Sequence, residues 1–156
     1  MAFEGDSFRL KRRGDGEKAP VRLRGFRLAT VLSHEDIRDA GSAKLFHRLD
    51  SAQVDEIAYA LEMWNLDGVT TNPRHVQASG KPFLAVIREI AGLFDGTDKP
   101  ISVEVNPHHT DWKAMVAEGE KLAAMCPNFV IKLPAIEPGF KAVAALAEKG
   151  IRSNLT

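Results

Sequence analysis

The sequence has little of several features that would assign a protein to a special class. Its one cysteine, Cys126, cannot form an internal disulfide, which fits a reducing cytosol. Its 21 basic and 21 acidic residues cancel, so the total charge gives no reason to expect a nucleic-acid or membrane-surface partner. No apolar run reaches the roughly 18 residues of a membrane span, and Glu4 and Asp6 stand where a signal peptide would be basic and then apolar. We therefore expect a cytoplasmic protein without membrane or nucleic-acid partners.

Residues 1–43 differ in composition from the rest of the chain. They are rich in arginine, lysine and glycine, and their apolar residues come in small clusters. Residues 21–28, VRLRGFRL, alternate apolar and basic side chains, which is typical of an edge strand or of an arm that packs on another subunit. Ser33 to Asp36 has the capping pattern of a short helix. We expect a basic, partly flexible N-terminal extension over residues 1–43 and one globular domain over residues 44–156.

From residue 44 onward, patterns of strand and helix length alternate. Apolar or β-branched runs, bounded by turn-forming residues, predict five strands at residues 45–50, 67–72, 101–105, 129–133 and 151–156. Apolar residues at helical spacing predict a helix after each of the first four strands. The stripe after the second strand consists of Phe83, Val86, Ile87, Ile90 and Phe94, and that after the fourth of Phe140, Val143, Ala144 and Ala147. Gly150 is placed to end the last helix.

This alternation predicts an α/β fold with a parallel sheet covered by helices. Such a sheet either stays open or closes into a barrel. No G-x-G-x-x-G or G-x-x-x-x-G-K-[ST] turn follows any predicted strand, so the open nucleotide-binding sheet lacks its usual motif. We therefore favour a (β/α)8 TIM barrel, of which the sequence supplies about the first five β/α units. The expected structure is an incomplete barrel.

The predicted strand at residues 129–133 contains a lysine, Lys132, among apolar residues. Strands buried on both faces are apolar almost throughout, so a lysine fills such a position poorly. Its amine either reaches water at the strand end or stays in surroundings that disfavour the charged form. A neutral amine attacks carbonyl carbons, and desolvated lysines form Schiff bases with sugar or keto substrates. From this strand alone the solvated lysine is the more common case.

The other predicted strands also carry polar side chains at their carboxyl ends. These are Asp50 on the first, Thr70 and Asn72 on the second, Glu104 on the third, and Asn154 and Thr156 on the fifth. Residues two apart on a strand share a face, so each pair points to one side of the sheet. Barrel enzymes place their chemistry at this edge. Turn formation explains an asparagine at a strand end, but it explains neither Glu104 nor Lys132.

These residues lie in five short motifs that resemble, in order, motifs of the transaldolase and fructose-6-phosphate aldolase family. The motifs are RLDSA around Asp50, VTTNP at residues 69–73, ISVEV around Glu104, FVIKLP around Lys132 and SNLT at residues 153–156. VTTNP together with VIKLP is fairly specific, whereas either motif alone is weak. The resemblance covers residues 45–156. It implies a (β/α)8 barrel and class I aldolase chemistry that needs no metal or other cofactor.

The resemblance implies catalytic roles for four residues. Lys132 would form the Schiff base, and Asp50 would exchange a proton with the substrate hydroxyl beside the bond that breaks. Glu104 and Thr156 would hold the water that serves imine formation and hydrolysis. A carboxylate near the lysine also makes chemical sense, because it favours the imine cation as it forms.

The resemblance also implies a substrate and the residues that bind it. Asn72 and Asn154 would bind substrate hydroxyls, and Thr70 would support the pocket. The expected reaction transfers a dihydroxyacetone unit between sugar phosphates, as in the pentose phosphate pathway. Glu104 favours the transaldolase branch, because the aldolase branch is similar but carries a glutamine there. Carbon–carbon cleavage like that of fructose-6-phosphate aldolase is the alternative.

A complete barrel of this kind has eight strands and typically about 250 residues, whereas this sequence reaches the fifth strand. Three interpretations are open: a C-terminally truncated transaldolase-like chain whose activity is in question, a barrel completed by another chain, or a non-catalytic remnant. The late strands would carry the family's phosphate-binding arginine. An open barrel edge exposes strand and apolar surface, so we also expect possible homo-oligomers through that edge.

A zinc site is the weaker interpretation of the remaining polar residues. Its ligands would be Glu104, His108, His109 and Cys126. Adjacent histidines after an Asn-Pro pair more often lie in a solvated loop, and no paired ligand spacing supports coordination. We therefore expect no metal.

Overall fold

The computed structural model describes residues 28–31, 46–64 and 66–156. The predicted helix at Ser33–Asp36 and most of the predicted edge strand at residues 21–28 lie outside the described residues. In the described part of the chain, no helix combines the length and the apolar character that crossing a membrane would require.

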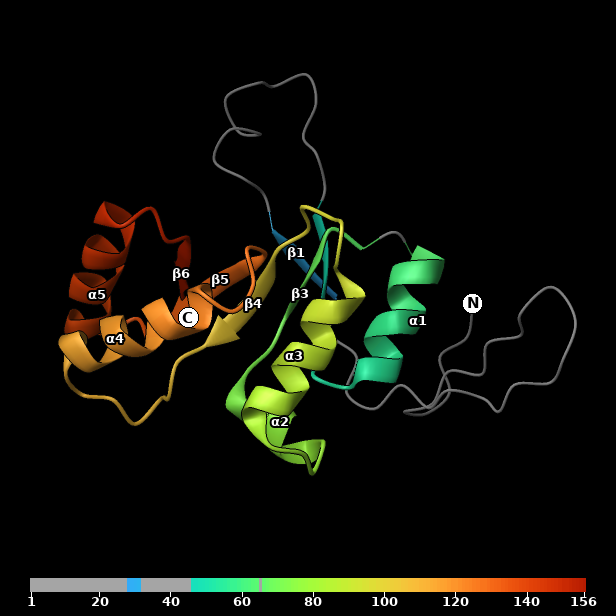
Figure 1. The fold of residues 1–156 in the computed structure, drawn as a ribbon, viewed down its shortest axis with the longest axis horizontal. Helices are drawn as coiled ribbons and strands as arrows, with labels where there is room; N and C mark the ends of the chain where they lie inside the picture. The colour runs from blue at the N-terminus through green and yellow to red at the C-terminus, as the bar shows by residue number, and fades with distance from the viewer. Residues whose placement is uncertain (1–27, 32–45, 65) are drawn as a thin grey trace, which may run out of the picture.

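The described strands form one six-stranded sheet in the order of the sequence (Figure 1). They are β1 Leu28–Val31, β2 Phe46–Asp50, β3 Gly68–Thr70, β4 Ile101–Glu104, β5 Phe129–Leu133 and β6 Ser153–Leu155. β2 to β6 run parallel, and β1 pairs antiparallel with β2. The predicted alternation of five parallel strands with helices is therefore confirmed, as the first part of a (β/α) barrel that is not closed over the described residues.

Five helices connect the parallel strands. They are α1 Val54–Trp64, α2 Pro73–Ala78, α3 Phe83–Leu93, α4 Trp112–Ala123 and α5 Glu137–Glu148. In Figure 1, α1 and α3 lie together beside β2 and β3, whereas α4 and α5 lie together beside β5 and β6. Gly150, with φ of 70°, follows α5 in the left-handed conformation that glycine adopts most easily.

Alternate residues of each strand divide the sheet into a helix-covered face and an inner face. On β5, Phe129, Ile131 and Leu133 are buried, whereas Val130 and Lys132 are only partly buried on the other face. A Cβ added at Gly119 of α4 would meet Ile131 at 3.2 Å, so α4 packs directly on the buried residues. The hydrophobic core therefore lies between sheet and helices, and it leaves the face of Lys132 for polar groups.

The inner face is concave. Neighbouring strands lie about 4.8 Å apart, so β4 and β6, which flank β5, are separated by roughly twice that distance along a flat sheet. The Ser102 hydroxyl of β4 nevertheless donates to Oδ1 of Asn154 on β6 at 2.7 Å. A contact that reaches across the intervening strand requires the sheet to curve toward this face. The curvature is that of a barrel wall, and it brings the inward side chains of successive strands together.

The helices of the structure differ from the predicted ones at two places. The stripe Phe140, Val143, Ala144 and Ala147 does not form the buried side of α5. The buried residues of that helix are Gly139, Ala142 and Leu146, and Phe140 is 56% exposed. The helix turns Gly139, Ala142 and Leu146 inward, and a Cβ at Gly139 would meet the carbonyl oxygen of Pro134, just after β5.

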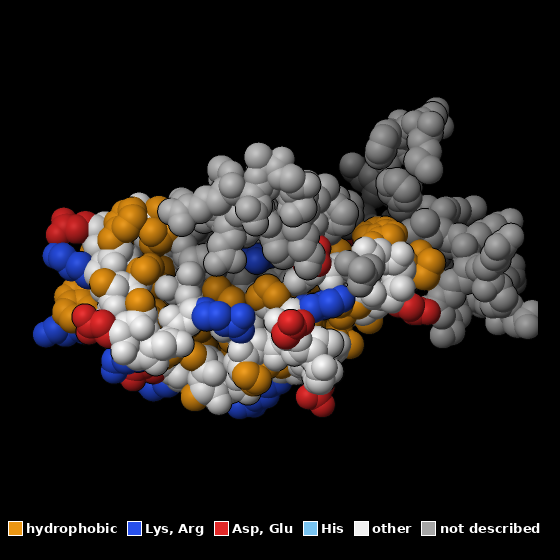
Figure 2. Space-filling model, turned by 90° about the horizontal axis from the view of Figure 1, so that it is seen from above, with side chains coloured by type: hydrophobic (Ala, Val, Ile, Leu, Met, Phe, Trp, Pro, Cys, Tyr) orange, Lys and Arg blue, Asp and Glu red, His pale blue; other side chains and the backbone are white. Residues whose placement is uncertain are grey.

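The second difference is α2, a short helix between β3 and α3 that the sequence pattern does not predict. Asn72 caps it and Pro73 occupies its first turn. By contrast, the stripe predicted for α3 is confirmed, because Val86, Ile87, Ile90 and Phe94 are fully buried and Phe83 is partly buried against the same core. Figure 2 shows that basic and acidic side chains are interspersed with hydrophobic groups on the face it presents.

The close approach of α5 to the end of β5 predicts the effect of a single methyl group. A Cβ at Gly139 would collide with the carbonyl oxygen of Pro134, so we expect Gly139→Ala to lower the free energy of unfolding by about 1–3 kcal/mol. Gly92 in α3 is the matched control, because its Cβ would meet nothing within 4 Å. Gly92→Ala should stabilise by about 0.4–1 kcal/mol. Urea unfolding measures both, and equal effects would contradict the proposed packing.

Candidate active site

The centre of the inner face is an ion pair between Lys132 of β5 and Glu104 of β4. The two residues are direct neighbours in the parallel register. The Lys132 Nζ lies 3.3 Å from Oε2 of Glu104, and their side chains are only 14% and 13% exposed. A lysine with its whole side chain in water is therefore excluded, because the side chain is mostly covered and its amine lies beside a carboxylate. Removing either partner would leave a poorly solvated charge without its ion-pair partner.

Asp50, the last residue of β2, lies in a second polar group on the neighbouring strands. It pairs in register with Thr70, whose hydroxyl donates to Oδ1 of Asp50 at 2.9 Å. The ring Nε2 of His75 lies 3.2 Å from the other oxygen, Oδ2. Both oxygens of the carboxylate are thus held, one by each neighbour. Sequence reasoning identified Asp50 and Thr70 but missed His75.

Asn72 follows β3 and caps α2. Its Oδ1 accepts a hydrogen bond from the backbone N–H of His75 at 3.0 Å. The side-chain oxygen of this predicted substrate-binding asparagine therefore caps the helix. Its amide N–H groups, which are the donors that a sugar hydroxyl or carbonyl would use, have no partner among the described residues.

Asn154 lies beside Lys132 in the register between β5 and β6. Its Oδ1 accepts the hydrogen bond from Ser102 described above, so its side chain is on the inner face. Thr71, fully buried, donates from its hydroxyl to the carbonyl oxygen of Ser102 at 3.0 Å. This bond ties the carboxyl end of β3 to β4.

Thr156, the fourth predicted catalytic residue, follows β6, and no hydrogen bond among the described residues joins its side chain to the Lys132–Glu104 pair or to the Asp50 group. Its backbone is held against the end of β5, since its N–H donates to the Leu133 carbonyl at 2.9 Å and its carbonyl accepts from Ala135 at 2.8 Å. Its side chain is exposed, and within the described ranges no hydrogen bond joins its hydroxyl to Glu104. The pairing of these two residues around a water stays a prediction.

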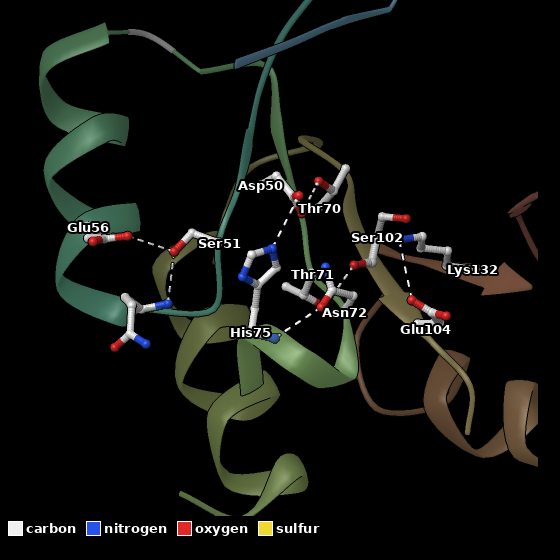
Figure 3. Close-up of polar contacts among 11 residues, drawn as sticks. Asp50, Ser51, Glu56, Thr70, Thr71, Asn72, His75, Ser102, Glu104 and Lys132 are labelled. Carbon is white, nitrogen blue, oxygen red and sulfur yellow. Dashed lines mark hydrogen bonds and ion pairs between the residues drawn. The ribbon is translucent and has the colours of Figure 1, made fainter. Parts of the chain in front are cut away.

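Figure 3 shows the two polar groups at the same edge of the sheet, at the carboxyl ends of the strands. Asp50, Thr70 and His75 form one group, and Glu104 and Lys132 form the other, with Ser102 beside Lys132 (Figure 3). Side chains from several strands therefore meet at this edge, as the sequence predicts. The nucleophilic amine on β5 and the two carboxylates, on β2 and β4, can support both imine chemistry and proton transfer.

A cavity of about 320 Å³ adjoins this edge. Pro73, Phe83, Pro107 and Glu104 are among the residues that line it, and Asp50 and Lys132 are not. Glu104 thus contacts the amine of Lys132 and also lines this mainly apolar cavity.

The histidines after β4 make contacts of a structural kind. His109 Nε2 lies 2.8 Å from Oε2 of Glu118, which also accepts the backbone N–H of Asn106 at 2.9 Å. Over the described ranges, no three histidine, cysteine or acidic side chains are grouped closely enough to hold a metal ion.

Residues 48–156 match the family model described as transaldolase/fructose-6-phosphate aldolase. The chain belongs to this family. The match includes Asp50, Glu104 and Lys132 and covers more than half of the sequence. The family resemblance of the five strand motifs is therefore confirmed.

Curated relatives of the family carry transaldolase names. The chain is 54% identical over 109 residues, 69% of its length, to the 6-deoxy-6-sulfo-D-fructose transaldolase of Priestia megaterium. It is 49% identical over 108 residues to a probable transaldolase of Desulforudis audaxviator and 44% identical over 113 residues to one of Dictyoglomus turgidum. These alignments cover 48%, 48% and 50% of the relatives. The chain spans about half the length of the curated relatives it matches.

The burial of the Lys132–Glu104 pair predicts strong energetic coupling between the two side chains. We expect Lys132→Met and Glu104→Leu each to destabilise the fold, because each leaves one charge without its partner. The double variant should regain most of the loss, with a coupling energy of about 0.5–3 kcal/mol in urea unfolding.

The Lys141–Glu137 pair on α5 is the matched control, because its side chains are 57% and 80% exposed. Solvent screens such a pair, so its coupling should be clearly smaller. Equal coupling in the two cycles would contradict the desolvated environment of Lys132.

Proposed function

We propose that the chain carries Schiff-base transaldolase chemistry, transferring a dihydroxyacetone unit between sugar phosphates. The observation that carries the proposal is the Lys132–Glu104 pair, 3.3 Å apart and largely out of water at the carboxyl edge of a barrel-like sheet. Membership of the transaldolase/fructose-6-phosphate aldolase family supports the same reaction class.

In the first step, the Lys132 amine attacks the ketone carbon of the donor sugar. The amine must be neutral to act, and Glu104 is the nearest acceptor for the proton that the ammonium gives up. The carbinolamine then loses water to form a protonated imine. The carboxylate of Glu104 stabilises this cation as it stabilises the ammonium, so the pair serves before and after the bond forms.

In the second step, Asp50 removes the proton from the donor hydroxyl beside the bond that breaks. The electrons of the carbon–carbon bond flow into the protonated imine and form an enamine, while the first aldehyde leaves. Attack of the enamine on an acceptor aldehyde reverses these movements, and Asp50 returns the proton. Thr70 fixes the carboxylate through its 2.9 Å hydrogen bond.

The remaining predicted residues bind substrate and water. Asn72 offers its amide N–H groups to donor hydroxyls while its carbonyl oxygen caps α2. Asn154, beside Lys132 in register, binds a second hydroxyl. Thr156 and Glu104 would hold the water that hydrolyses the final imine. These roles follow the family resemblance and agree with the inner-face positions of Asn154 and Glu104.

The donor we propose is a ketose with an anionic group on carbon 6. Fructose 6-phosphate fits a role in the pentose phosphate pathway. 6-Deoxy-6-sulfo-D-fructose is the second candidate, because a relative with 54% identity is named for that sugar. The two donors share the dihydroxyacetone end that Lys132 would capture, and they differ only at the anionic end.

Trapping with borohydride tests the Schiff base directly. The 156-residue chain, incubated with dihydroxyacetone and reduced, should gain one covalent sugar unit, which peptide mass spectrometry should place on Lys132. Lys132→Met should gain none. Lys141→Met is the control, because Lys141 is an exposed lysine on α5 and its loss should leave trapping unchanged. A chain that is folded by circular dichroism and gains no adduct, or gains it elsewhere, would support the non-catalytic interpretation.

The role of Asp50 predicts a separation of two partial reactions. Dihydroxyacetone lacks the hydroxyl from which Asp50 would take a proton, so Asp50→Asn should leave trapping on Lys132 intact. Cleavage of fructose 6-phosphate or of the 6-sulfo sugar should fall by about 100-fold or more. Asp55→Asn, at an exposed carboxylate on α1, is the control. Release of free dihydroxyacetone without an aldose acceptor would instead indicate the aldolase-like reaction.

A further inference from the structure

We propose that His75 is a positioning residue for Asp50, which it holds in the orientation needed for carbon–carbon bond cleavage. The inference deepens the proposed function and rests on it. His75 lies outside the five family motifs. Its link to the site is the 3.2 Å contact between its Nε2 and Oδ2 of Asp50.

The contacts of Asp50 show what His75 adds. A carboxylate on a strand end can rotate about its side-chain bonds unless both oxygens are bound. Thr70 binds Oδ1 at 2.9 Å, and His75 binds Oδ2. With Asp50 ionised, Nε2 of His75 carries the proton and donates it to the carboxylate. Two donors on separate elements then hold the carboxylate at a fixed angle, and one lone pair of each oxygen remains for the donor hydroxyl.

The local sequence explains why His75 reaches back to β2. Asn72 caps α2 by accepting the backbone N–H of His75, and Pro73 starts the helix with a fixed φ angle. His75 is therefore placed within the first turn of α2, at the carboxyl edge of the sheet, and its half-buried ring meets Asp50 (Figure 3). One asparagine thus serves both the substrate pocket and the anchoring of the histidine.

The proposed role predicts different effects of His75 on imine formation and on ketose cleavage. Imine formation at Lys132 with dihydroxyacetone involves no proton transfer to Asp50, so it does not depend on His75. Cleavage of a ketose needs Asp50 to take the hydroxyl proton as the bond breaks, so it depends on the carboxylate angle. A side chain that merely stabilised the fold would affect both reactions together.

The test compares three variants of the 156-residue chain. His75→Leu removes the donor at similar volume, whereas His75→Gln keeps an amide N–H of similar reach. His108→Leu is the control, because His108 lies in the exposed loop after β4. The probes are dihydroxyacetone with borohydride for trapping, and fructose 6-phosphate and 6-deoxy-6-sulfo-D-fructose for single-turnover cleavage.

We expect His75→Leu to slow cleavage of the better donor by about 10-fold or more, as for loss of a hydrogen bond to a charged group. KM for that donor and trapping at Lys132 should not change. His75→Gln should recover most of the rate, and His108→Leu should match the unmodified chain. In the Asp50→Asn background, His75→Leu should have no further effect, because the carboxylate that it orients is gone.

Three results would overturn the inference alone: unchanged cleavage in His75→Leu, equal losses of trapping and cleavage in both His75 variants, or further slowing of Asp50→Asn by His75→Leu. Absence of trapping in the unmodified chain would overturn the proposed function and this inference with it. The trapping experiment therefore separates the two failures.

Discussion

The parallel register between β4 and β5 is the constraint on which the candidate site depends. It places Glu104 directly beside Lys132, so a carboxylate and an amine that would be costly to remove from water singly are partly buried as a pair. Because side chains alternate between the two faces of a strand, Ile131 and Leu133 point to the helices and Lys132 points to the inner face. The hydrophobic core and the polar site thus lie on opposite faces of the same sheet. The parallel register also places Asp50 beside Thr70 and Lys132 beside Asn154.

Much of this arrangement can be predicted from the sequence, because strand alternation and turn residues are local signals. The strand at residues 129–133 has the predicted ends, and the apolar stripe of α3 forms the buried side as expected. Asp50, Glu104 and Lys132 are each predicted near the carboxyl end of a strand, and the carboxyl ends of parallel strands meet at one edge of the sheet. Family membership, established over residues 48–156, accounts for the order of the motifs.

What could not be predicted depends on packing rather than on periodicity. α2 is only six residues long, too short for an amphipathic stripe, so its capping asparagine was interpreted only as a substrate-binding residue. His75 was missed for the same reason, since nothing in the local pattern relates it to a strand that ends 25 residues earlier. The buried side of α5 differs from the predicted stripe because Gly139 lies against the carbonyl oxygen of Pro134, just after β5, and Phe140 then points to solvent. In the sequence, the buried side of α5 is indicated only weakly, by Gly139 three residues before Ala142.

The division of β5 into two faces also limits how this part of the chain can change in length. Inserting or deleting one residue within Phe129–Leu133 would turn the lysine toward α4 and α5 and an aliphatic side chain toward Glu104. A change of one residue in a loop between a helix and a strand does not reverse the face to which the strand side chains point. Insertions and deletions in those loops therefore leave the amine on the inner face. The short strands tolerate exchange of side chains, but they do not tolerate a one-residue shift of register.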